Sequence, residues 1–198
     1  MAAQIEFVPD DFRNCMDELR KEFGTNKKIP IDMEMQCLAA LSFFPEFREL
    51  QICFRYKSIK TTMASLPAFS NIFKKKAKRK YNIFINDHEK HSDSIALDQV
   101  PFNAQIGVIG HELAHIIDYL NKNTFSLLIT GFRYFFRSFR RRYEKQTDIN
   151  TIQQGLGWAL YDFTYFVMHS HLASDKYKKH LQKYYLNADD IFKMIPDK

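Results

Sequence analysis

The sequence predicts an α+β fold in a single domain spanning residues 1–198, and three observations support this. Apolar residues recur at helical spacing near both ends of the chain, whereas residues 50–86 show the alternation and β-branched content of strands. Hydrophobic residues make up 45% of the chain, which is enough for a buried core. No repeat or linker separates the segments, so helices and strands are expected to share one core.

The N-terminal part, about residues 9–44, is expected to form two helices. The first follows Pro9 and ends at Gly24, since its apolar residues lie three and four positions apart. The second runs from Pro30 to about Phe44, where another proline stops it. Its inward residues are expected to be Met33, Cys37, Leu38 and Leu41.

Strands are predicted in the next part, about residues 50–86. Ile52, Phe54 and Tyr56 alternate with less apolar residues, which predicts one or two strands before Pro67. After a lysine-rich turn, Tyr81–Asn86 has high β-propensity and is followed by a loop rich in strand-breaking residues, so it is predicted as a further strand.

Helices return in the second half of the sequence. Apolar residues at helical spacing predict a helix over about 103–122, with Asn103 as its N-cap. The remaining part, about 124–195, is predicted to be helical and begins with a helix rich in Phe and Arg from Thr124 to about Arg140.

Composition excludes several classes of protein. The N-terminus is acidic where a signal peptide needs basic residues, so a cytoplasmic location is expected. Three cysteines without CxxC spacing argue against a disulfide framework and against a cysteine metal site. The apolar run Phe125–Phe136 contains Arg133 and is shorter than the ~20 residues that a membrane-spanning helix needs.

The net charge of +6 is concentrated in two segments. Residues 74–80 and 133–142 hold 11 of the 29 basic residues, and the rest of the chain has 18 basic against 23 acidic residues. Such patches are typical of proteins that bind nucleic acid or anionic membranes. Nucleic acid is the disfavoured partner, because no groove-reading motif accompanies either segment. The simpler interpretation of both basic segments is that they are solvent-exposed surface without a binding role.

One motif carries chemistry. His111-Glu112-Leu113-Ala114-His115 lies within the predicted helix 103–122. Residues four apart stack on one helix face, so both imidazoles can bind one ion while Glu112 stands beside them as a general base. A core helix with satisfied histidines is the alternative, and it is disfavoured because burying these polar groups without a ligand is costly.

The third ligand is expected to be a downstream carboxylate. The glycine and third histidine of the metzincin pattern are absent, since those positions hold Asp118 and Asn121. Glu144 is the only glutamate after Glu112 in the sequence, and Asp148 follows it by one helical turn. A carboxylate at Asp148 could accept the second ring proton of a ligating histidine.

These residues resemble the gluzincin zinc metallopeptidases, the thermolysin-like clan, and most of all its small single-domain bacterial forms. The resemblance implies a zincin-like fold and a Zn²⁺ ion bound by His111, His115 and Glu144, with Glu112 as general base and Asp148 supporting a ligand. It also implies that Tyr81–Asn86 is the strand nearest the cleft, and this strand is expected to be an edge that pairs with an extended peptide. Candidates for the family's transition-state stabiliser are Tyr143, His169 and His171.

Helical phase tests the assignment of Glu144. In an unbroken helix Glu144 would project with the arginines, away from the apolar face of the Phe/Arg helix. A break is therefore predicted near Arg140–Tyr143, with Glu144 on a new helix. The apolar face of the Phe/Arg helix is expected to pack in the core, with contact to an anionic membrane as the second interpretation.

Two functions follow from the sequence. The first is a hydrolase, a zinc metallopeptidase that cleaves peptides or proteins through a zinc-activated water, with Glu112 moving the proton. The second is a catalytically silent zinc-binding protein whose basic patches engage nucleic acid or an anionic membrane.

Overall fold

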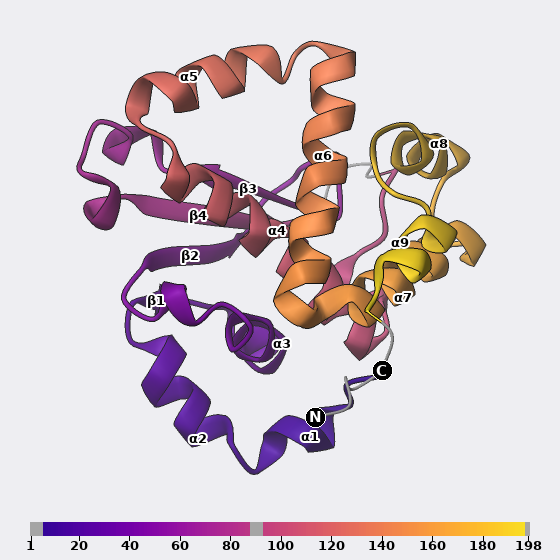
Figure 1. Cartoon of the computed structure of the whole chain (residues 1–198). Coiled ribbons are helices and arrows are strands. Elements are labelled where there is room, and N and C mark those ends of the chain that lie inside the picture. The colour runs from indigo at the N-terminus through magenta and orange to yellow at the C-terminus, as the bar shows by residue number, and fades with distance from the viewer. Residues whose placement is uncertain (1–5, 88–92, 197–198) are drawn as a thin grey trace.

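The computed structural model describes residues 6–87 and 93–196, and it has the predicted α+β composition. A small sheet lies beside a larger group of helices (Figure 1). Three short helical segments at the N-terminus lie on the β1 side of the sheet, and the C-terminal helices lie above and to the right of the sheet in Figure 1. The long helix α4 packs against both parts.

The sheet is mixed and has its antiparallel strand at one edge. Its strand order is β1-β2-β4-β3, in which β1, β2 and β4 run parallel and β3 runs antiparallel to β4. The expectation that Tyr81–Asn86 is an edge is wrong, because β4 lies between β2 and β3 and β3 forms the edge instead. The strands are β1 (Lys27–Lys28), β2 (Gln51–Tyr56), β3 (Met63–Pro67) and β4 (Lys80–Ile85).

The N-terminal helices are more interrupted than their periodicity predicted. The first is divided into α1 (Pro9–Arg13), α2 (Met16–Leu19) and a π-helical turn that ends at Gly24, as expected. The second is shorter than predicted: α3 spans Glu34–Leu41 after a 3-10 turn. The four residues expected to face inward from this helix are all buried, so the predicted face is confirmed.

The helix with the HELAH motif is α4, which spans Phe102–Asn121 and packs against β3, α3, α6 and α7. Asn103 does not cap it, because the N-cap position is Pro101; the buried Asn103 amide oxygen accepts a hydrogen bond from Phe7 N at 3.1 Å. At Gly107 the helix touches α7 so closely that a Cβ atom would lie 2.2 Å from the Ala159 carbonyl oxygen.

Five helices form the C-terminal part. The predicted break occurs, but at Tyr134–Phe136 rather than Arg140–Tyr143, because the chain is already extended at Phe136 (ψ 122°), the residue that precedes α6. Glu144 is thus on a new helix, as predicted. The helices are α5 (Thr124–Arg133), α6 (Arg137–Thr151), α7 (Gly157–His169), α8 (Asp175–Tyr184) and α9 (Ala188–Met194), with a π-helical turn at Ile152–Leu156.

The apolar face of α5 is exposed, which contradicts the expectation that it packs in the core. Phe125 and Phe132 are 72% and 66% exposed, and Phe135, just after the helix, is 86% exposed. The opposite side of α5, with Leu127 and Thr130, is the buried one. Helical periodicity identified a one-sided helix correctly but could not tell which side meets the protein.

Two further expectations concern cysteines and membranes. Cys15, Cys37 and Cys53 are all free, in agreement with the absence of disulfide spacing. Among the described residues, no helix has both the length and the apolar content required to cross a bilayer.

Candidate metal centre

Three buried side chains converge between α4 and α6. His111 and His115 lie one turn apart on α4, and Glu144 reaches them from α6. Glu144 Oε2 is 3.3 Å from His111 Nε2 and 3.2 Å from His115 Nε2. The three side chains are nearly inaccessible and their donor atoms all lie within 4.8 Å of one another, so this group could hold a metal ion.

Glu144 reaches this position because the buried face of α6 is polar. The buried residues of this helix are Glu144, Thr147, Asp148 and Thr151, spaced three and four positions apart. Buried faces of helices are normally apolar, and buried carboxylates are rare unless they are partnered. The pattern is therefore that of a helix selected to place oxygen atoms against α4.

The hydrogen bonds around the histidines fix their tautomers. His111 Nδ1 is 2.9 Å from Asp148 Oδ1, a carboxylate oxygen that can only accept. His115 Nδ1 is 3.2 Å from Thr147 Oγ1, whose own proton goes to the Tyr143 carbonyl. In their neutral forms both imidazoles would thus carry their proton on Nδ1, and Nε2, which faces the Glu144 carboxylate, would be left to bind a metal ion.

Three potential ligand atoms face one another at this point, and a metal ion or a proton could lie between them. His111 Nε2 and Glu144 Oε2 are buried and make no hydrogen bond among the described residues. Burial alone would lower the pKa of His111, but its contacts with Asp148 and Glu144 outweigh this and hold that pKa well above its usual value. A proton would thus occupy the site when no metal is bound, and a metal ion would have to displace it.

The other oxygen of Glu144 is held by a tyrosine. The Tyr134 hydroxyl, from the break between α5 and α6, donates a hydrogen bond to Glu144 Oε1. Burial first and then the Glu144 charge raise the pKa of Tyr134, so its hydroxyl stays a donor. The predicted break therefore also supplies a residue that orients the third donor.

Glu112 lines a small cavity beside the histidines. The cavity volume is about 40 Å³. Glu112 is only 6% exposed, and its Oε2 has no hydrogen-bond partner among the described residues. A buried carboxylate without a partner is costly unless a ligand or water uses it. The wall of the cavity is formed by Thr61, Met63, Val108, His111, Glu112, Asp148, Leu160, Phe163, Thr164, Tyr177, Leu181 and Tyr185.

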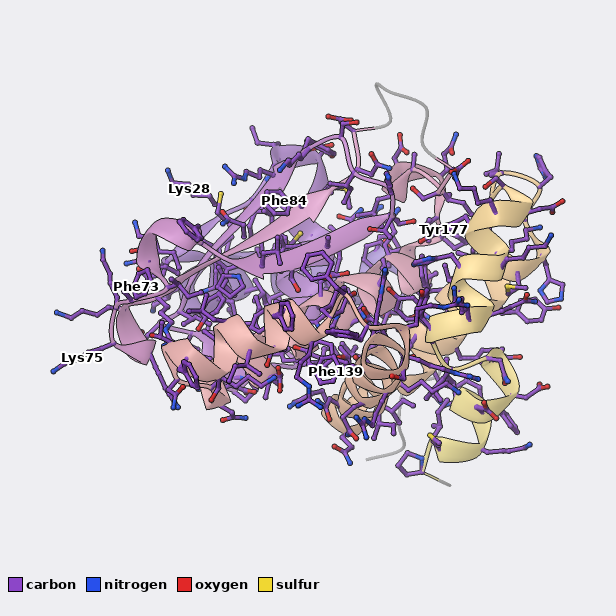
Figure 2. The ribbon with its side chains drawn as sticks, turned by 90° about the horizontal axis from the view of Figure 1, so that it is seen from above. Lys28, Phe73, Lys75, Phe84, Phe139 and Tyr177 are labelled. Atoms are coloured by element: carbon purple, nitrogen blue, oxygen red, sulfur yellow. The ribbon has the colours of Figure 1, made fainter. Side chains whose placement is uncertain are left out.

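The segment after α7 closes this cavity. Tyr177 of α8 pairs with Thr62 Oγ1 at 3.0 Å, next to β3, and lies at the α8 side of the molecule in Figure 2. The ring of Tyr185 lies 5.5 Å from that of His111. Asp148 Oδ2 accepts the backbone N–H of Leu186 at 2.8 Å, so one carboxylate joins the histidine to the closing segment.

The candidates for transition-state stabilisation are not gathered at the cavity. Tyr143 stacks on His115 with ring centroids 5.4 Å apart, but its hydroxyl donates to Asp118 Oδ2 at 2.6 Å and the residue is not part of the wall. His169 and His171 are exposed at the end of α7 and just beyond it. The tyrosines that do line the cavity, Tyr177 and Tyr185, were missed because only the tertiary fold brings them there.

Comparison with known proteins adds no assignment to this geometry. No protein-family model, no curated protein and no solved structure matches the chain.

Proposed function

We propose that this protein is a zinc-dependent peptidase that hydrolyses peptide bonds, with the zincin-like arrangement that its HELAH motif implies. The observation that carries the proposal is the convergence of His111, His115 and Glu144 on one point, beside the buried Glu112, whose Oε2 has no hydrogen-bond partner among the described residues. An ion site alone does not need a second carboxylate next to it. Hydrolysis by a metal-bound water does.

The donor set fits zinc. Tetrahedral zinc with bonds of about 2.0–2.2 Å places neighbouring ligand atoms roughly 3.3–3.6 Å apart, and Glu144 Oε2 lies 3.3 and 3.2 Å from the two Nε2 atoms. Two imidazoles and one carboxylate are a usual set for catalytic zinc, whereas calcium and magnesium prefer oxygen ligands throughout.

Charge points the same way. Glu112, Glu144 and Asp148 are buried within this small region, and none of them forms an ion pair with Lys or Arg in the part of the chain that the structure describes. Uncompensated buried carboxylates are strongly disfavoured. A divalent cation supplies the missing positive charge.

The chain's own residues then have distinct roles. Bound zinc would supply a water whose pKa is lowered towards ~7. Glu112 would serve as the general base that takes a proton from this water, and would return the proton to the amine that leaves. Asp148 and Thr147 hold the two imidazoles in the Nδ1–H form, and Tyr134 orients Glu144.

Substrate entry requires the wall to open. A cavity of about 40 Å³ holds roughly three water molecules, so the structure corresponds to a closed form. Met63 in the wall belongs to β3, an edge strand of the sheet. The Met63 and Ser65 carbonyls accept hydrogen bonds from Thr61 Oγ1 at 2.7 Å and from the Tyr119 hydroxyl at 3.2 Å, so an extended peptide that pairs with this edge would have to displace these two side chains. Tyr177 and Leu181 belong to α8, so the displacement of this helix would expose the cavity along β3.

The closed wall also favours a second candidate function. A protein that binds zinc structurally and never opens would be a regulatory or interaction protein without hydrolytic activity. Its zinc would hold α4 and α6 together, while its surface met a partner.

One experiment separates the two functions. The full chain is loaded with zinc, its metal content is measured by elemental analysis, and hydrolysis is followed on a broad library of fluorogenic peptides. Glu112→Gln is expected to retain zinc and lose about 10²–10⁴-fold in hydrolysis, while the exposed Glu18→Gln behaves as wild type. Stoichiometric zinc in the wild type with no hydrolysis of any peptide would reject the peptidase and favour the second candidate.

A further inference from the structure

An apolar surface is exposed around α5, which the proposed function does not use. We call this the α5 surface. Helix α5 and the turn after it present their large apolar side chains on the side away from the core. Two phenylalanines of the segment between β3 and β4 are exposed as well. The side chains of the α5 surface, which are between 40% and 86% exposed, are Phe69, Phe73, Phe125, Leu128, Ile129, Phe132, Phe135 and Phe136.

The two segments of this surface are fastened together. The Arg79 guanidinium donates to the Lys122 carbonyl at 2.8 Å and to Thr124 Oγ1 at 3.2 Å. The Thr124 hydroxyl donates in turn to the carbonyl of Ile72 at 2.9 Å. These bonds hold the β3–β4 segment against the start of α5, as Figure 1 shows along the upper left of the molecule.

Basic residues surround the apolar side chains. Five exposed ones are Lys74, Lys75, Lys78, Arg133 and Arg137. In the described part of the chain, none of these five forms an ion pair with a carboxylate. Neither stretch of sequence, 61–80 or 124–143, contains an Asp or Glu. Lys75 extends away from the protein body beside Phe73 in Figure 2.

We propose that the α5 surface docks on an anionic lipid bilayer. Phenylalanine and leucine side chains on a helix with flanking Lys and Arg are the composition that binds at the boundary between headgroups and acyl chains. The basic residues are attracted by anionic headgroups within a Debye length of the membrane. The apolar residues insert below them.

Charge and side-chain type favour this occupant over others. A second copy of the chain would bring the same unpaired positive charges to the interface, which disfavours self-association. A nucleic acid would meet the charges and stack on the rings, but Leu128 and Ile129 offer no ring to stack on.

Docking is separate from the metal centre. None of the residues that line the cavity belongs to α5 or to the segment 69–80. Membrane binding can therefore be present or absent whatever the outcome of the zinc and hydrolysis measurements.

Co-sedimentation of the full chain with vesicles tests the proposal. The vesicles contain phosphatidylcholine alone or with roughly a third phosphatidylserine, at low and high salt. Binding is expected to the anionic vesicles and to weaken with salt. Phe132→Glu together with Phe135→Glu should reduce the partition coefficient at least about tenfold per residue, because each ring no longer inserts. Lys74→Ala with Lys75→Ala should reduce it about fivefold per lysine.

Matched controls carry the same changes elsewhere. Ile31→Glu alters a side chain that is 95% exposed outside the α5 surface, and Lys21→Ala with Lys179→Ala removes two exposed charges. These variants should bind as the wild type does, and circular dichroism should show that all variants are folded. Equal binding by wild type and the phenylalanine variant would overturn the proposal. The proposal would also be overturned if the wild type did not bind anionic vesicles but formed a dimer through Phe132 in sedimentation velocity. The same holds if it bound nucleic acid and not the vesicles.

Discussion

Replacing Asp148 by asparagine should weaken the metal centre without changing a ligand. The carboxylate accepts two buried hydrogen bonds, from His111 Nδ1 at 2.9 Å and from Leu186 N at 2.8 Å. An asparagine amide has one accepting oxygen, so its NH₂ group must face one of these donors. The substitution is nearly isosteric, and therefore its effects report on hydrogen bonding rather than on packing.

Each orientation of the amide has a calculable cost. If the oxygen stays with Leu186, the NH₂ group faces His111 and favours the tautomer with its proton on Nε2, where the metal should bind. Loss of such a supporting contact lowers metal affinity about 10- to 100-fold, or about 1.4–2.7 kcal/mol. If the oxygen stays with His111, the buried N–H of Leu186 loses its acceptor, which costs about 1–3 kcal/mol of the free energy of unfolding.

Two measurements on the same samples check this prediction. Zinc affinity is measured by competition with a chromophoric chelator, and the free energy of unfolding of the metal-free protein by urea denaturation. The exposed Asp189→Asn should change neither quantity. Thr147→Val, which removes the acceptor of His115 Nδ1, should lower zinc affinity by a smaller factor of about five, because only one hydrogen bond between neutral groups is lost. An Asp148→Asn protein with wild-type zinc affinity and wild-type stability would refute the reasoning.

Three other predictions concern packing, the cysteines and pH. Gly107→Ala should destabilise the protein by several kcal/mol or prevent folding, since the added Cβ would lie 2.2 Å from a carbonyl oxygen. Gly131→Ala should instead stabilise the protein by up to about 1 kcal/mol, because the added Cβ would meet no atom within 4 Å. Urea denaturation compares the free energies of unfolding of the two variants. Cys37 is fully buried, and burial raises the pKa of its thiol, so iodoacetamide should leave it unmodified in the native protein and react with it after unfolding, as mass spectrometry can show. Zinc affinity should fall as pH decreases, because the raised pKa of His111 means that this residue holds a proton that zinc must displace. The metal-free fold should lose the stabilisation from the same proton as pH rises through the raised pKa. Competition titrations between about pH 6 and 8 that show no change of zinc affinity with pH would contradict this.

The parts of the fold that local sequence determines were predictable. Residue spacing over a few positions predicts the HELAH helix, the strand with Ile52 and Phe54, and the new helix that carries Glu144. Glu144 could be predicted as the third ligand because it is the only glutamate after the HELAH motif. Asp148 could be predicted as the acceptor of a histidine ring proton because it follows Glu144 by one helical turn. In the structure Glu144 Oε2 lies 3.3 Å from His111 Nε2, and Asp148 Oδ1 lies 2.9 Å from His111 Nδ1.

The rest depends on contacts between distant residues. Whether β4 or β3 is the edge is decided by pairing across the sheet, which no local pattern encodes. Tyr177 and Tyr185 reach the cavity through the path of the chain after α7, more than 60 residues beyond His111 in the sequence. The sequence predicted helices in this part of the chain but not which element they would pack against.

Helices α5 and α6 reverse the usual relation between burial and polarity, and they do so one after the other. On α5 the side away from the core is apolar, and on α6 the side towards the core is polar. Exposed apolar area and buried carboxylates are each unfavourable for an isolated chain, so their retention requires something outside the chain to compensate them. A bound cation would compensate the carboxylates of α6, and a bilayer would cover the phenylalanines of α5. The break at Tyr134–Phe136 makes both possible, because it lets α6 direct Glu144 at the histidines while α5 keeps its apolar face outside.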